Sequence, residues 1–200
     1  MYKVFFNRKW VLLTTKIVAH DDQTPFFYVK FSEQKQIISA LKSKKIKGIY
    51  LYHSKEKKLW KHVLKIFSLV EAAGGLVEHQ NGKVLFIYRN NKWDLPKGKI
   101  EKKEILIDGA IREVMEETGV KDLIVKKNLN HTFHIFSKNG NYKLKKTYWY
   151  LMTTSYEGVL DPQLEEGIVM AEWKTKEEIP YLMRNAYENI KLLFEEIDMN

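Results

Sequence analysis

Residues 98–120 hold the densest set of groups that could do chemistry. Glu113, Glu116 and Glu117 stand at positions i, i+3 and i+4 of a stretch whose apolar residues recur mostly every three or four positions. This spacing predicts an amphipathic helix that carries three carboxylates on one face. Like charges so placed destabilise a helix by about 0.2–0.5 kcal/mol per pair, so the face requires a cation. Carboxylate oxygens suit Mg²⁺, which commonly binds one or two carboxylates together with substrate phosphates.

Two more charged residues belong to the same segment. Arg112 lies four residues before Glu116 and eight after Glu104, so it is placed to neutralise one or both carboxylates. Gly119 follows the last apolar turn, where a left-handed residue commonly ends a helix. We therefore expect the helix to end at this glycine.

The spacing resembles the signature of the Nudix hydrolases: Gly, five residues, Glu, seven residues, Arg-Glu-aliphatic, one residue, Glu-Glu, one residue, Gly-aliphatic. Every defined place is filled, by Gly98, Glu104, Arg112, Glu113, Val114, Glu116, Glu117, Gly119 and Val120. A run of charges is more often a solvated helix face. The complete pattern outweighs that interpretation here.

The resemblance implies an α/β/α sandwich with a mixed β-sheet over residues 69–200, and hydrolysis of nucleoside diphosphates linked to a further moiety. It implies Mg²⁺ as the cofactor, with Mn²⁺ as an alternative. The residues implied to hold the metal are Glu113, Glu116, Glu117 and the backbone carbonyl of Gly98. Arg112 and Glu104 would chiefly pair with each other, and Glu104 is a candidate to touch a metal. Either Glu116 or Glu117 would orient or deprotonate the attacking water.

The run Trp93-Asp94-Leu95-Pro96-Lys97-Gly98-Lys99 resembles the variant found in diadenosine polyphosphate hydrolases and their relatives. Lys97 and Lys99 are candidate contacts for a polyphosphate, and Trp93 is a candidate to stack on a base. The alternatives are solvated lysines and simple packing of the tryptophan. Further along, Glu165 or Glu166 is a candidate for one more catalytic or metal-binding acid, against an interpretation as surface charge.

The residue pattern predicts strands at 83–89, entered through a turn at Asn81-Gly82, and at 123–126, 131–137 and 145–155, with an amphipathic closing helix over 186–197. Residues 68–77 resemble the first strand of the family, and 168–173 with a helix starting within 175–179 resemble its late strand and helix.

Residues 1–68 differ from the rest in charge. They contain 15 Lys and Arg against 4 Asp and Glu, a net charge of +11, whereas 69–200 carry −2. We expect a small basic α/β accessory domain with strands at 2–6, 10–15, 26–31 and 48–53. Its helices are expected over 33–44, capped by Ser32, and over 55–67, capped by Ser54.

The chain has no cysteine, which excludes disulfides and fits a cytoplasmic protein. Its first apolar stretch is interrupted by Arg8, Lys9 and Lys16, so we expect neither a signal peptide nor a membrane span. The basic domain could contact RNA, present a positive rim to polyphosphates or shield the acidic site in a homodimer. The alternative is a lysine-rich surface on a domain that only packs.

Two classes of function remain. The first is a Mg²⁺-dependent pyrophosphohydrolase acting on a dinucleoside polyphosphate or a nucleoside triphosphate, with a 5′-triphosphate RNA end as an alternative substrate. The second is a non-enzymatic nucleotide-sensing or nucleic-acid-binding regulator built on the same scaffold.

Overall fold

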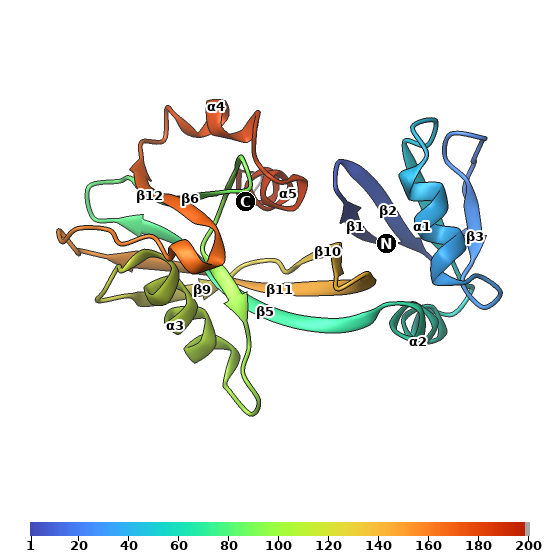
Figure 1. Cartoon of the computed structure of the whole chain (residues 1–200), viewed down its shortest axis with the longest axis horizontal. Helices are drawn as coiled ribbons and strands as arrows, with labels where there is room; N and C mark the ends of the chain where they lie inside the picture. The colour runs from blue at the N-terminus through green and yellow to red at the C-terminus, as the bar shows by residue number, and fades with distance from the viewer. Residues whose placement is uncertain (199–200) are drawn as a thin grey trace. The chain divides into compact units, whose positions relative to one another are not determined.

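The computed structural model describes residues 1–198, which form two compact units (Figure 1). The first holds residues 1–70 and 133–146, and the second holds 71–132 and the chain from 147 onward. The segment 133–146, which the sequence boundary at residue 69 assigns to the second domain, thus belongs to the first unit. The reason is packing, because Phe133, Ile135 and Leu144 are buried in the apolar core of that unit.

The second unit is built on a mixed sheet of strands in the order β12-β6-β5-β11. Strands β5 (Ser68–His79) and β11 (Asn141–Thr154) also contribute residues to the first unit, and β6 (Val84–Arg89) and β12 (Ile168–Lys174) pair antiparallel. Three shorter strands join them: β7 (Lys92–Asp94) pairs with β6, β8 (Lys97–Lys99) with β5, and β9 (Ile124–Asn128) with β11. A 3₁₀ turn, η1 (Leu164–Glu166), precedes β12.

Helices cover both faces of this sheet. Alternate strand residues point to opposite sides, so Val77 and Leu85 pack against α3 (Leu106–Thr118), while Leu76 and Phe86 pack against α5 (Glu188–Asp198). The second unit is therefore an α/β/α sandwich, and the predicted fold class is confirmed. A short helix, α4 (Ile179–Met183), precedes α5.

The first unit has strands in the order β10-β1-β2-β4-β3. β1 (Tyr2–Phe6) and β2 (Lys9–Thr14) form a hairpin, in which Asn7 takes a positive φ of 54°. β10 (Thr132–Lys138) pairs parallel with β1, and β3 (Phe26–Tyr28) and β2 both pair parallel with β4 (Gly48–Tyr52). Helices α1 (Gln34–Lys42) and α2 (Glu56–Ile66) pack on this sheet through Ile37, Leu41, Leu59 and Val63. The first unit thus has α/β structure and includes 133–146 besides the 1–68 of the sequence boundary, and its role as an accessory domain stays a prediction.

Two predicted helix caps are wrong. The N-cap of α1 is Glu33, whose side chain forms a capping box with Gln36, while the Ser32 hydroxyl donates to the carbonyl of Tyr28. The N-cap of α2 is Lys55, with no side-chain capping bond, in place of Ser54. The expected strand over 26–31 ends at Tyr28 because a tight turn follows. None of the helices in residues 1–198 is long and apolar enough to cross a membrane.

Candidate active site

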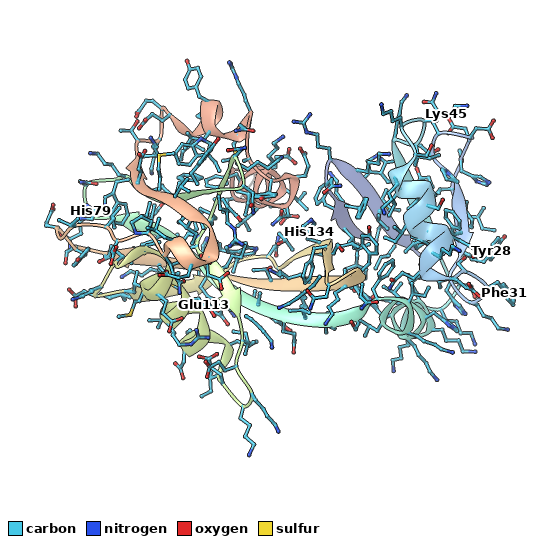
Figure 2. The ribbon with its side chains drawn as sticks, in the orientation of Figure 1. Tyr28, Phe31, Lys45, His79, Glu113 and His134 are labelled. Carbon is cyan, nitrogen blue, oxygen red and sulfur yellow. The ribbon has the colours of Figure 1, made fainter. Side chains whose placement is uncertain are left out.

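Gly98 of β8 lies directly beside Glu113 of α3. Gly98 pairs with Ala73 of β5, which fixes its backbone beside the helix. A Cβ atom at position 98 would lie 1.7 Å from Glu113 Oε2, so only glycine leaves room for the carboxylate. Glu113 itself lies on the middle of α3 (Figure 2). The glycine of the motif therefore serves to admit a carboxylate against the main chain.

Arg112 binds three carboxylates of the segment. Its Nε donates to Glu104 Oε1 at 2.7 Å, and its Nη2 donates to Glu104 Oε2 at 2.9 Å, a bidentate pair. Its Nη1 donates to Glu113 Oε1 and to Glu116 Oε2, both at 2.8 Å. The expected brace across Glu104 and Glu116 is present, and Glu113 is added to it. A further bond from Nη2 to the Lys99 carbonyl ties the loop to the helix.

Glu117 lies on the last turn of α3 and is 2% exposed. Its Oε2 accepts the backbone N–H of Lys97 at 2.8 Å, and Arg89 Nη1 lies 3.4 Å from its Oε1. Burial raises the pKa of Glu117 to about 7, against the opposing influence of Lys97 and Arg89. The site therefore contains a carboxyl group on which the effect of burial exceeds that of its two partners.

The other carboxyl groups differ in environment. The Arg112 hydrogen bonds, helped by the Glu101 N–H, lower the pKa of Glu104 to about 2. Burial raises the pKa of Glu113 despite its bond to Arg112. The segment thus holds one carboxylate before the helix, Glu104, whose ionised form is favoured, and two on α3, Glu113 and Glu117, that resist ionisation until a further cation is near.

Lys97 makes its side-chain contacts within the protein. Its Nζ donates to Asp94 Oδ2 at 2.7 Å, and the lysine and aspartate are 8% and 4% exposed. Lys99 is exposed at the end of β8. The Trp93 ring contacts Tyr88 edge-on at 5.0 Å, and Lys174 Nζ lies 5.0 Å from its centre. The roles of Lys97, Lys99 and Trp93 toward a substrate stay predictions.

Sequence reasoning missed Arg89 and Asp94. Arg89 ends β6 and faces Glu117, and Asp94 ends β7 and holds Lys97. The available signals were that Arg89 is a charged residue at the end of an apolar strand and that Asp94 is an acid three residues before a lysine. Both are weak, because their partners are defined only by the folded chain.

Glu165 and Glu166 lie in η1 and are exposed. The loop before them packs on the end of α3, where the N–H of Asp161 donates to the Thr118 carbonyl and that of Gln163 to the Glu117 carbonyl. The extra-acid role of Glu165 or Glu166 therefore stays a prediction for residues next to the site.

The donor set fits a hard divalent cation: four carboxylates belong to one segment, and Gly98 lets the Glu113 carboxylate lie against the main chain. Within residues 1–198, no three acidic or histidine side chains are gathered closely enough to hold a metal as they stand. Arg112 draws Glu113 and Glu116 toward itself, whereas Glu117 turns toward Lys97 and Arg89.

Comparison with known proteins agrees with this geometry. Residues 69–194 match the NUDIX domain, well over half of the chain. The chain belongs to the Nudix family. The predicted membership is thereby confirmed, and it accounts for the sandwich and for the carboxylates on α3.

Three relatives illustrate the likeness. The chain is 31% identical over 102 residues to mRNA decapping complex subunit 2 of Schizosaccharomyces pombe, a match that covers 51% of this chain and 13% of that subunit. It superposes on a C. elegans Ap4A hydrolase with a TM-score of 0.51 and 20% identity, over 65% of this chain and 96% of that one. The MutT protein from Methanosarcina mazei Go1 gives a TM-score of 0.52 and 23% identity, over 66% and 95%. The two structural likenesses show that the Nudix fold is shared.

Proposed function

We propose that this Nudix protein is a divalent-metal-dependent pyrophosphohydrolase that cleaves a phosphoanhydride bond in a nucleoside diphosphate linked to a further group. The observation that carries the proposal is the contact of Glu113 with Gly98 beside Glu116 and Glu117 on the same helix. It supports the proposal because these hard oxygen donors share one helix, and a cation could neutralise them together. Mg²⁺ is the metal we favour, with Mn²⁺ as the alternative.

Each residue of the cluster has a separate task in this proposal. Glu113, Glu116, Glu117 and the Gly98 carbonyl would hold the metal, which when bound offsets charge on the attacking and leaving oxygens. Arg112 keeps Glu104 ionised and fixes the loop through the Lys99 carbonyl. The choice of Glu116 or Glu117 as the group that orients water stays open.

The substrates we favour are dinucleoside polyphosphates and nucleoside triphosphates. Lys99 supports this because it is an exposed cation on the strand next to the cluster, suited to a chain of phosphates. Lys97 would act chiefly through its backbone, which orients Glu117.

A 5′-triphosphate RNA end is the second candidate substrate. It is supported by the likeness to a decapping subunit and by the basic first unit, in which 19 Lys and Arg stand against four Asp and Glu, a net charge of +15. A non-enzymatic regulator is less well supported, because every acid of the motif is present. The cytoplasmic location and the homodimer stay predictions.

The test is a product assay with Mg²⁺, Mn²⁺ or EDTA on a panel of substrates. The panel holds dinucleoside polyphosphates, nucleoside triphosphates, ADP-ribose, nucleotide sugars and a 5′-triphosphate RNA. Metal-dependent cleavage of one class supports the proposal and identifies the substrate. Absence of cleavage throughout, together with a nucleotide-induced rise in melting temperature, would favour the regulator instead.

A further inference from the structure

One face of the sheet in the first unit carries aromatic side chains. Strand residues alternate between faces, and Val11, Leu13, Ile49 and Leu51 point toward α1 and α2, where they are buried. The opposite face receives the residues between them. The register pairs Tyr50 with Phe26 and Tyr52 with Tyr28, so rings on neighbouring strands lie on the same side.

These rings form a continuous row across three strands. The ring centres of Trp10 and Tyr50 are 5.0 Å apart, and those of Phe26 and Tyr52 are 5.1 Å apart. The row ends at Tyr28, whose ring centre is 5.3 Å from that of Tyr52. Within residues 1–198, none of these five side chains belongs to the core that packs on the helices.

The two ends of this row differ in their surroundings. Gly48 lies opposite Trp10, and a Cβ there would be 2.1 Å from the indole, so the missing side chain lets the ring lie across β4. Tyr28, on the strand at the end of the sheet, is 52% exposed, and Phe31 beyond it is 75% exposed. Figure 2 shows both at the outer side of β3. The other four rings of the row are half-buried. A flat, apolar ligand surface would fit against such a row of rings.

The charge around the row is positive. Lys30 Nζ lies 5.0 Å from the centre of the Phe31 ring, and Lys3 lies on the same face of the sheet, opposite Leu12. With a net charge of +15 in this unit, a second copy of the same surface would be repelled. The ligand should therefore be both flat and anionic.

We propose that this aromatic face, defined by Trp10, Phe26, Tyr28, Tyr50 and Tyr52, binds single-stranded nucleic acid. Bases would stack on the rings and lysines would contact the phosphates, the combination by which proteins hold single strands without reading their sequence. In a duplex the bases already stack on each other, so the rings could not reach their faces. RNA and DNA share this chemistry. The inference goes beyond the proposed hydrolysis, because the first unit lies outside the catalytic cluster.

The test is fluorescence anisotropy of the full chain with a short, 3′-labelled oligonucleotide that ends in a 5′-hydroxyl. EDTA removes divalent metal, and the oligonucleotide carries no 5′-phosphates, so binding at the proposed hydrolytic site should not add to the anisotropy. A negative result here would therefore not bear on the proposed hydrolysis. Single-stranded RNA, single-stranded DNA and a duplex of equal length are compared over a range of salt. We expect the single strands to bind more tightly than the duplex, with affinity falling as salt rises. The RNA and DNA arms identify which of the two is preferred.

Substitutions of single tyrosines test the contribution of stacking to binding without changing the charge of the protein. Tyr28→Ala and Tyr52→Ala should each weaken single-strand binding by about 5- to 150-fold, the loss expected for one stacked base. Tyr28→Phe keeps the ring and should bind like the wild type. The matched control is Tyr181→Ala, a change at a 66% exposed tyrosine of α4 in the other unit, which should have no effect.

Tyr28 is largely exposed, so Tyr28→Ala should fold normally and carries the test even if Tyr52→Ala does not. Equal binding of single strand and duplex, with Tyr28→Ala unchanged, would overturn the proposal and leave only non-specific attraction. Failure to bind any oligonucleotide at low salt would also overturn it.

Discussion

The backbone N–H of Lys97 donates a hydrogen bond to Glu117 Oε2 at 2.8 Å, and so joins β8 to the last turn of α3. The side chain of the same lysine is turned to Asp94. The loop that precedes the motif is therefore held to the helix by buried polar contacts. Its position depends on an ion pair that the motif itself does not contain.

Asp94→Asn tests this ion pair. The substitution leaves the buried ammonium of Lys97 without its carboxylate, and breaking a buried pair from one side typically costs about 3–5 kcal/mol. Urea unfolding should show a loss of this order. The double variant Asp94→Asn with Lys97→Met is the control, and it should regain part of the stability. A midpoint unchanged in Asp94→Asn would mean that the pair does not form.

Gly98→Ala tests the approach of Glu113 to the main chain. The new Cβ would occupy the position of the carboxylate, at 1.7 Å from Oε2, and so displace it. A shift of about 1 Å in a catalytic group can lower the rate about 10²-fold, so we expect the turnover rate to fall by about that factor. The metal concentration needed for half-maximal activity should rise. The melting temperature should change little, since Glu113 is a flexible side chain. Wild-type kinetics would show that the contact between Gly98 and Glu113 is not part of the active site.

Much of this arrangement follows from the sequence, and the remainder has a physical reason. The three-and-four periodicity predicts α3, and Gly119 ends it with a φ of 71° as expected. The partners of Asp94 and Arg89 were not predictable, because each pairing arises from tertiary contact. Ser32 was expected to cap α1, but its hydroxyl finds the Tyr28 carbonyl in the turn before the helix.

Arg112→Ala removes hydrogen bonds to three carboxylates and to the Lys99 carbonyl. The remaining carboxylates then repel one another, so we expect a loss of about 1–3 kcal/mol in the free energy of unfolding, together with lower activity. Chemical denaturation in EDTA measures the stability. Arg112→Lys retains the charge without the bidentate geometry and should recover only part of it. Unchanged stability in the alanine variant would refute the bracing role.

Tyr148, outside the motif, should contribute to stability in a way that depends on pH. Its hydroxyl donates to Glu71 Oε1 at 2.7 Å, and burial together with this bond raises its pKa to about 12 from 10.0. The folded state holds this proton more tightly than the unfolded chain, so the stabilisation is complete below pH 10 and is lost as pH rises toward 12. The stability difference between wild type and Tyr148→Phe should change over that range. A difference independent of pH would contradict the raised pKa.

The most direct test of the central claim compares Mg²⁺-dependent hydrolysis by wild type, Glu116→Gln and Glu117→Gln on whichever substrate the panel identifies. Each substitution removes a proposed metal ligand while keeping side-chain size, so turnover should fall by about 10²-fold or more with the fold retained. Glu101→Gln, at an exposed glutamate whose backbone N–H donates to Glu104, is the matched control and should keep wild-type turnover. Near-wild-type rates for both Glu116→Gln and Glu117→Gln would contradict the claim that this carboxylate cluster holds the catalytic metal.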